Sequence, residues 1–448
     1  MNLETPRQKD ESKTGSTIKA VKAVRSMSLP LQVVGFLLLA FLMLAVMSKW
    51  TALFDLQADR LNHTVNQAEF EDYVAFYAAG KLVAEGRGAD LYETEVLAAK
   101  EREVMGRPVG GTGSLGFFNP PFVALFFAPF TLLPVGEAGV ALFLVNSVLV
   151  LGVTGGIRRM LNIEGPIPSL LFALAALSLQ SVFWLVAHGQ FSMWLFLGFL
   201  YFFWFQQQGR PALSGFALTL LLVKPQMAIL PALVLLWKKD WRALASFSSV
   251  TVLLVVGSIA VSGTSVLWEY PSFALNSTGW ERELGINVER MYGWNGLFAT
   301  IVANHSPVHI MLTASATVAT VGLVLWGFSS VQPSSSRFAL ACAALVAGAI
   351  LVNPHVYLQD MVLGALIVVL GFLGSRELSW PGFFWVGAAA FLWLVQEYSD
   401  KLLDEFSLNL LSICLIGLLL FLVRGARASV DQSSGKSGRS LTVQPEAA

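Results

Sequence analysis

The chain has 448 residues, of which 55% are hydrophobic and only 13% are charged. Soluble domains contain about 25% charged residues, so this composition excludes an ordinary soluble domain and indicates an integral membrane protein. The 29 basic and 29 acidic residues cancel in net charge, which gives no basis for binding nucleic acid.

The N-terminal segment, residues 1–28, is polar and basic and is followed by a long apolar run. The run from Leu31 to Met47 is long enough to cross a bilayer. It is too long for the apolar core of a signal peptide and lacks a cleavage site of small residues. We therefore expect an uncleaved first span, with the basic residues before it on the cytoplasmic side.

The chain from about residue 50 to residue 136 is expected to form a first large outer loop. It contains the stretch EFEDYVAFYAAGKLVAEGRGADLY, which opens with three carboxylates at the start of a predicted helix. Carboxylates at such a position commonly interact with the free amides and the dipole of the helix N-terminus. Asp72 also heads an apolar stripe at i, i+4, i+7 and i+11 that ends at Val83. A carboxylate at the border of the protein body could instead act as a general base.

The next segment, FFNPPFVALFFAPFTLLP at residues 117–134, is apolar but is interrupted by prolines. Its apolar part covers roughly 12 residues, fewer than the roughly 20 that a membrane helix needs. A crossing here would also place Arg158 and Arg159 on the outer face, against the positive-inside rule. We therefore expect a short interfacial or re-entrant helix on the outer side, buried in protein or lining a cavity.

With that segment outside, every basic cluster between spans falls on the cytoplasmic face, and about 12 transmembrane helices result. One pair is a broken hairpin, in which residues 212–223 and 227–237 flank the tip KPQ. A second large outer loop covers about residues 262–306 and contains a short segment of its own. The sequence thus predicts an all-α polytopic membrane protein with two large outer loops and with both termini in the cytoplasm. The transmembrane domain is expected to cover residues 29–425, and a disordered tail residues 426–448.

Several polar residues are candidates for a site on the outer face. Lys224 interrupts an apolar run and is either a snorkelling interfacial lysine or a functional cation suited to an anionic head group. His355, in the predicted loop NPHVYLQD, could be no more than an exposed loop histidine. Arg282 and Arg290 in the second outer loop are either solvated or bind a ligand. The remaining candidates, which would line the cavity, are Glu71, Tyr77, Asn119, His188, Gln190, Tyr357 and Asp360.

Together these segments resemble the polyprenol-phosphate-mannose-dependent mannosyltransferases of glycosyltransferase family 87, within the GT-C superfamily. The matching pieces lie in the family's order between Asp72 and Asp360, and they are DYVAFYAAGKLVAEGRGADLY, FFNPPFVALFFAPFTLLP, GQFSMWLFL, KPQMAILPALVLLWKKDWRAL and NPHVYLQD. The chain departs from the pattern at Asn119, where many members have Tyr. The resemblance implies a GT-C-like fold with Asp72 as the catalytic acid residue and His355 near the donor phosphate or the acceptor.

The resemblance also implies a reaction on the outer face of the plasma membrane. A hexose, by family expectation mannose, would pass from a polyprenyl-phosphate-sugar donor to a hydroxyl of a glycolipid or glycan acceptor. The leaving phosphate needs charge stabilisation, and the acceptor needs a base. Asp72 would be that base, with inversion at the sugar. From its charge and position, and not from the resemblance, we infer that Lys224, with Arg282, Arg290 or His355, would hold the phosphate. Neither a metal nor a cofactor is expected.

Two other classes of protein share some of these features. A transporter or flippase for a lipid-linked or small molecule also has polar breaks such as VKPQ, but its site is expected near the bilayer midplane, between repeats. A scaffold protein would not need an acid, a lysine and a histidine on one face. An enzyme predicts a cavity open to the outer surface and sideways to lipid, lined by Asp72, Lys224 and His355.

Overall fold

The computed structural model describes residues 29–62, 72–110, 112–276, 284, 286–375 and 382–428. Within these ranges the regular elements are α-helices and short 3-10 helices, with no strand, so the prediction of an all-α fold is confirmed. The elements are α2 (Leu29–Leu61), α3 (Asp72–Ala84), η2 (Gly88–Asp90), α4 (Thr94–Met105), α5 (Pro121–Phe127), η3 (Ala128–Leu132), α6 (Val135–Met160), α7 (Pro166–Leu177), α8 (Gln180–His188), α9 (Ser192–Gln207), α10 (Pro211–Leu218), η4 (Thr219–Val223), α11 (Gln226–Trp237), α12 (Trp241–Ser262), α13 (Val266–Leu275), η5 (Val288–Arg290), α15 (Trp294–Ala299), α16 (Pro307–Phe328), α17 (Arg337–Val352), η6 (Leu358–Met361), α18 (Val362–Ser375), α19 (Gly382–Phe406) and α20 (Leu410–Arg427).

Among the described helices, six are long and apolar enough to cross a membrane, and the bent pair of α7 and α8 makes a possible seventh. Shorter apolar segments, among them α17 and the two arms of the hairpin at KPQ, add to this bundle. The part of the chain that the structure describes is therefore all-helical, and its apolar helices indicate a multi-pass membrane protein. The larger number of spans expected from the sequence stays a prediction.

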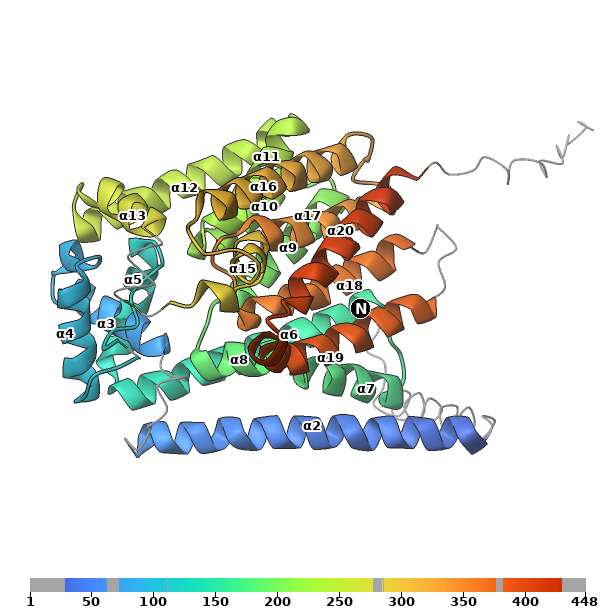
Figure 1. Cartoon of the computed structure of the whole chain (residues 1–448), viewed down its shortest axis with the longest axis horizontal. Coiled ribbons are helices and arrows are strands. Elements are labelled where there is room, and N and C mark those ends of the chain that lie inside the picture. Colours follow the sequence, from blue (N-terminus) through green and yellow to red (C-terminus); the bar gives the residue numbers. More distant parts are fainter. Residues whose placement is uncertain are drawn as a thin grey trace, which may run out of the picture.

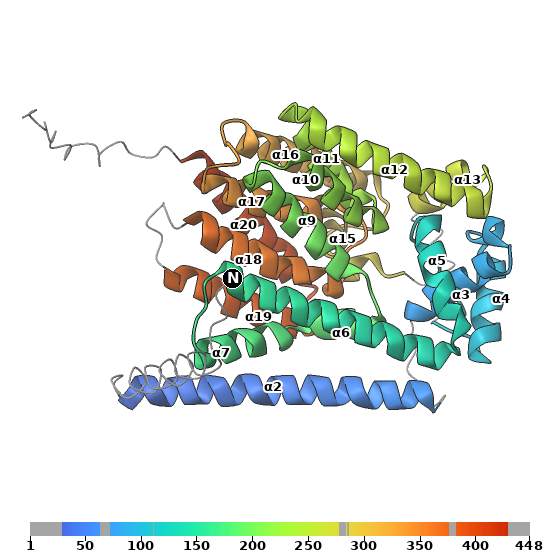
Figure 2. The ribbon, with the colours of Figure 1, turned by 180° about the vertical axis from the view of Figure 1, so that it is seen from behind.

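The helices form an elongated bundle that is closed at one end by a separate group of short helices (Figure 1). We call this group, residues 72–132 with α3, α4 and α5, the cap. In both views α2 runs along one side of the bundle, and α11, α12 and α16 lie on the opposite side (Figures 1 and 2). The cap has its own apolar core, built by α3 and α5, next to the larger core of the bundle. The two cores meet at one end of the molecule, which is where a site between them would lie.

Helix α2 extends further than the sequence predicted, since it continues past Trp50 to Leu61. Its 33 residues give a length of about 50 Å, more than the ~30 Å hydrocarbon layer requires. The additional turns are fixed by packing, because Gln57 and Arg60 are both buried and Arg60 donates a hydrogen bond to the carbonyl oxygen of Ala187. The start of the first predicted outer loop is therefore helical and is anchored to α8.

The short proline-rich segment forms a short helix, as predicted. Pro121 occupies the first turn of α5, where its missing N–H costs no hydrogen bond, and the chain then tightens into η3. Gly80 of α3 lies so close to α5 that a Cβ there would be 2.8 Å from the carbonyl carbon of Phe127. This close packing buries α3 on most of its surface, so the apolar stripe that begins at Asp72 is only part of its buried face.

The predicted single span near residues 169–187 is instead two helices, α7 and α8, that meet at 57°. The break releases the backbone carbonyl of Ser178, which would be costly to bury without a partner. Lys49 Nζ donates to this oxygen at 2.9 Å and Trp393 Nε1 donates to it at 3.2 Å. Side chains from α2 and α19 thus stabilise a bend that local sequence does not reveal.

Candidate active site

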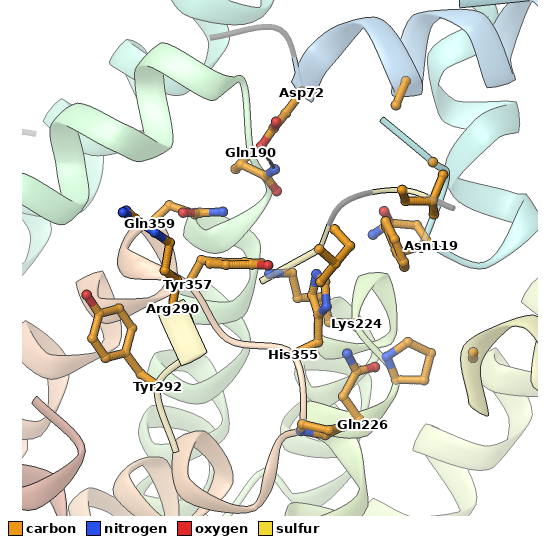
Figure 3. Close-up of a pocket in the computed structure, with 18 of the residues that line it drawn as sticks. Asp72, Asn119, Gln190, Lys224, Gln226, Arg290, Tyr292, His355, Tyr357 and Gln359 are labelled. Atoms are coloured by element: carbon orange, nitrogen blue, oxygen red, sulfur yellow. Dashed lines mark hydrogen bonds between the residues drawn. The ribbon is translucent and has the colours of Figure 1, made fainter. Parts of the chain in front are cut away.

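A cavity of about 1040 Å³ lies between the cap and the bundle. Polar side chains from the cap, from the turn after α8, from the break between η4 and α11, and from the loop after α17 surround it (Figure 3). The sequence-predicted residues that line it are Asp72, Asn119, His188, Gln190, Lys224, Arg290, His355 and Tyr357. Residues far apart in the sequence therefore converge on one space at one end of the bundle.

Asp72 is the first residue of α3, and its carboxylate faces the turn after α8. Gln190 Nε2 donates a hydrogen bond to Asp72 Oδ2 at 2.7 Å, and His188 Nδ1 lies 2.8 Å from the same oxygen. Burial on its own would raise the pKa of this carboxyl. The charge and hydrogen bond of His188, the hydrogen bond of Gln190 and the charge of Lys224 outweigh burial and hold the pKa below its ordinary value. Asp72 is therefore an ionised carboxylate at neutral pH.

A glycine allows the turn between His188 and Gln190 to pack against α3. Gly189 has φ +68, in the left-handed region, and it ends α8. A Cβ added there would lie 3.0 Å from Cβ of Tyr73 and 2.6 Å from Cδ2 of Leu142. Only glycine satisfies both the backbone conformation and the close approach that brings these two polar side chains to Asp72.

Lys224 lies at the helix break predicted from KPQ, and its ammonium group lines the cavity. It is not a snorkelling lysine, because Nζ is 2.6 Å from Oδ2 and 2.8 Å from Oδ1 of Asp360. Asp360 is fully buried, also accepts a hydrogen bond from Ser192 Oγ at 2.7 Å, and does not line the cavity. The structure therefore places Asp360 behind Lys224, as its counter-ion, and not at the cavity surface where the sequence placed it.

Asn119 connects the proline-rich segment to this helix break. Its Nδ2 donates to the carbonyl oxygen of Val223 at 2.7 Å, directly before Lys224, and its own carbonyl oxygen accepts from the Tyr92 hydroxyl at 2.8 Å. The amide thus satisfies a carbonyl that the end of η4 leaves without a helical partner. An asparagine at this position, where the family pattern often has tyrosine, has a clear structural task.

His355 forms part of the cavity wall between two aromatic rings. The Phe118 ring stacks on it at 5.0 Å between centroids, and the Tyr357 ring meets it edge-on at 5.1 Å. Burial and the charge of Lys224 lower the pKa of the imidazole to about 4, although the charges of Asp360 and Asp72 act in the opposite direction. His355 is therefore neutral at physiological pH, so it can donate or accept a hydrogen bond but adds no positive charge.

The remaining predicted site residues differ in where the structure places them. Arg290 lines the cavity but forms an ion pair with Asp404 at 2.6 Å, and its side chain is 46% exposed. Tyr77 does not line the cavity, because it is buried in the cap and its hydroxyl donates to the carbonyl oxygen of Leu133 at 2.8 Å. Glu71 and Arg282 lie outside the described residues.

Sequence reasoning missed several polar and aromatic residues of the wall. They are Phe118, Trp184, Gln226, Tyr270, Gln359 and Asp400. Phe118, Gln226 and Gln359 each lie within two residues of a residue that was selected, so proximity in sequence was a usable signal. The others come from apolar or loop segments that have no distinctive pattern, and only the tertiary fold brings them to the cavity.

Away from the polar end, the cavity continues along apolar side chains of the bundle. Leu230 and Leu233 of α11 and Val321 of α16 form its walls there. Ile229 of α11 also lines the cavity and is 59% exposed, so this part of the wall reaches the surface of the bundle. We call this part the apolar slot. The expected sideways opening toward lipid stays a prediction.

No group of three or more His, Cys, Asp or Glu side chains within the described ranges is arranged to hold a metal ion. The expectation of a metal-free reaction stays a prediction. What the polar end does offer is one ionised carboxylate, one ammonium group with its buried counter-ion, and one neutral imidazole around a single space (Figure 3).

The sequence of this chain matches one known protein family. Residues 117–354 match the model of glycosyltransferase family 87. The matched region includes Asn119, Lys224 and the apolar slot, while Asp72 precedes it and His355 follows it directly. No curated protein and no solved structure matches the chain.

Proposed function

The chain belongs to glycosyltransferase family 87, and from this premise we propose that it transfers a hexose, mannose by the family resemblance, from a polyprenyl-phosphate sugar to an acceptor hydroxyl. The acceptor is a hydroxyl of a glycolipid or glycan. The reaction occurs at the outer face of the plasma membrane, with both termini in the cytoplasm and a GT-C-like arrangement of helices. Neither a metal nor another cofactor takes part.

The observation that supports this proposal is the form of the cavity. Its polar end combines a carboxylate with an ammonium group and an imidazole, and the apolar slot leads from that end to the side of the bundle. A lipid phosphate sugar has the same sequence of parts, namely a polar sugar, an anionic phosphate and a long apolar chain. The lipid chain would occupy the slot between α11 and α16, and the sugar would lie near Asp72.

The chemistry assigns a task to each polar group. Asp72 accepts the proton of the acceptor hydroxyl while the acceptor oxygen forms a bond to the anomeric carbon. The bond from that carbon to the phosphate oxygen breaks, and its electron pair leaves with the phosphate. Attack from the face opposite the leaving group inverts the anomeric configuration.

The leaving phosphate needs positive charge or hydrogen-bond donors at the point where negative charge develops. Lys224 has three N–H donors, and the two contacts to Asp360 leave it able to direct one toward the cavity. His355, being neutral, supplies a hydrogen bond, and Arg290 adds a second cation at the rim.

The position of the cavity favours an enzyme over a carrier. The polar cluster lies where the cap meets one end of the bundle, whereas a carrier is expected to bind its substrate near mid-depth, between two repeats. A flippase is therefore the weaker alternative.

Reconstitution of the full-length protein in liposomes tests the proposed function. Polyprenyl-phosphate-mannose labelled in the sugar is supplied with a membrane glycolipid extract as acceptor, and both product formation and the sidedness of the donor are measured. The proposal predicts label in a new glycolipid with inverted anomeric configuration. Movement of unchanged donor between leaflets, without any new product, would contradict it and support the flippase.

A further inference from the structure

The contacts around Asp72 differ between its two carboxylate oxygens. Gln190 Nε2 donates a hydrogen bond to Oδ2, and His188 Nδ1 lies 2.8 Å from the same oxygen. Among the described residues, Oδ1 has no hydrogen-bond or ion-pair contact. Because a carboxylate can rotate about its side-chain bonds, two close contacts on one oxygen restrict the direction in which the other oxygen points.

The surrounding packing fixes the turn itself. Gly189 lies against Tyr73, the residue that follows Asp72. Arg60 connects the same two elements from behind, since its guanidinium lies 4.3 Å from the centre of the Tyr73 ring and donates to the Ala187 carbonyl oxygen. The turn and the start of α3 therefore form one unit, in which neither can shift without the other.

We propose that the His188–Gly189–Gln190 turn is a clamp that positions the catalytic base, with His188 and Gln190 holding Oδ2 so that Oδ1 receives the acceptor proton. This inference rests on the proposed function of Asp72 and extends it by assigning positioning roles to two residues. In the step itself the proton moves from the acceptor hydroxyl to Oδ1, and the carboxylate becomes a neutral carboxylic acid. Its O–H then points toward the cavity, away from the two donors.

The clamp also helps to keep the buried carboxylate of Asp72 ionised. A carboxylate that is buried beside an apolar slot tends to take up a proton, which would destroy the base. The groups that oppose this are the two donors of the clamp and the ammonium of Lys224, while Tyr357 and His355 are the other titratable groups that sense the charge of Asp72. Removal of a clamp residue should therefore move the protonation of Asp72 to higher pH.

Infrared spectroscopy of the purified full-length protein measures that protonation without any turnover. The carbonyl band of protonated Asp72 is assigned by its loss in Asp72→Asn and is followed as a function of pH. In His188→Ala and in Gln190→Leu the band is expected at a higher pH than in the wild type. His188→Asn is the matched control, because its Nδ2 can occupy the place of the histidine Nδ1 and should restore nearly the wild-type midpoint.

Kinetics then separate positioning from substrate contact. His188→Ala is expected to lower kcat for sugar transfer by about 10- to 100-fold, the usual consequence of a misplaced catalytic group, with an unchanged KM for the donor. His188→Asn should recover most of this loss. An unshifted infrared midpoint in His188→Ala, or a higher donor KM at wild-type kcat, would overturn the clamp. An inactive wild type with a shifted midpoint would instead contradict the proposed reaction and leave the clamp supported.

Discussion

Asp72 and Asp360, both near the cavity, have opposite surroundings. Asp72 faces the space and is held by neutral or weakly basic donors, whereas Asp360 is fully buried and is committed to Lys224. A base must exchange a proton with a substrate, so only Asp72 has the exposure for that task. Asp360 instead holds the buried ammonium group of Lys224 in place as its counter-ion.

The buried ion pair gives a prediction about stability. In Asp360→Ala the ammonium of Lys224 stays buried without its counter-ion, which should reduce the free energy of unfolding by about 3–5 kcal/mol. The double variant Lys224→Met with Asp360→Leu should recover most of that stability. Chemical unfolding in detergent micelles measures both, with Ser192→Ala as the control, since it removes one hydrogen bond to a charged group and should cost only about 1–3 kcal/mol.

The same pair of variants separates stability from function. The double variant is expected to fold and yet to transfer no sugar, because the phosphate has lost its ammonium group. Transfer at the wild-type rate by a folded double variant would show that Lys224 has no part in donor binding.

His355 gives a prediction about pH. Burial, together with the charge of Lys224, lowers its pKa from the ordinary 6.5 to about 4. Between these two values the unfolded chain binds a proton that the folded chain does not bind, so the free energy of unfolding should fall as the pH drops through this window. His355→Gln removes this contribution, and its Tm should depend less on pH there than that of the wild type. Parallel Tm curves for the two proteins would contradict a buried, neutral imidazole.

The sequence indicated which polar residues line the cavity, but it did not indicate which residues form ion pairs with them. Asp72, Lys224 and His355 stand out because each is an ionisable or polar residue next to an apolar segment, and the structure brings all three to one cavity. The pairing of Lys224 with Asp360 spans 136 positions in the chain, and no local pattern encodes such a distance. The sequence therefore grouped Asp360 with the cavity but could not show that it lies behind the wall.

At the scale of elements, short and broken helices shape the site. The break after η4 exposes Lys224, the short helix α5 lets the cap approach the bundle, and the end of α8 delivers the clamp turn. Prolines in the sequence predicted the first two of these features. The bend between α7 and α8 was missed because its stabilising donors, Lys49 and Trp393, come from distant helices.

The apolar slot gives a prediction about the donor lipid. Val321→Trp on α16 places a large ring in the slot, so transfer from a long-chain polyprenyl donor should fall about tenfold or more through a higher KM, since overfilling a packed apolar site costs about 1–3 kcal/mol. A donor with a short isoprenoid chain should be affected much less. Val318→Trp is the matched control, because Val318 is 71% exposed on the same helix and does not line the cavity. Equal losses with both chain lengths would contradict a lipid-binding slot.

At the scale of the whole molecule, the end away from the cap is tied together by basic side chains. Lys238 donates to the carbonyl oxygens of Phe328 and Val331, and Arg337 donates to that of Ala428. These bonds satisfy helix C-termini and also place positive charge at one end of the bundle. This is the distribution that the positive-inside rule expects of a cytoplasmic face.

Cysteine labelling tests this orientation. In a background with Cys342→Ala and Cys414→Ala, a membrane-impermeant maleimide should label Glu95→Cys, an exposed position of the cap, on intact cells. Gln208→Cys, which is exposed in the turn between α9 and α10, should react only after the cells are permeabilised. The reverse pattern would place the cavity on the cytoplasmic side and contradict a reaction on the outer face.

The all-helical membrane class was accessible from the sequence because composition and the length of the apolar runs reflect a membrane environment. The all-helical fold and the short helices follow from those features. The length of α2 does not, because its last turns are held by buried Arg60 and Gln57 against other elements. Beyond the end of the apolar run, tertiary packing determines how far this helix continues.

The most direct measurement of the central claim is sugar transfer by Asp72→Asn, compared with the wild type and with Asp90→Asn. Asparagine keeps the size of the side chain but cannot accept the acceptor proton, and Asp90 forms an exposed ion pair with Arg87 in the cap, away from the cavity. We predict that folded Asp72→Asn loses about 100- to 10,000-fold in kcat, as the removal of a general base should, while Asp90→Asn keeps the wild-type rate. Transfer by Asp72→Asn at the wild-type rate would contradict the assignment of Asp72 as the base.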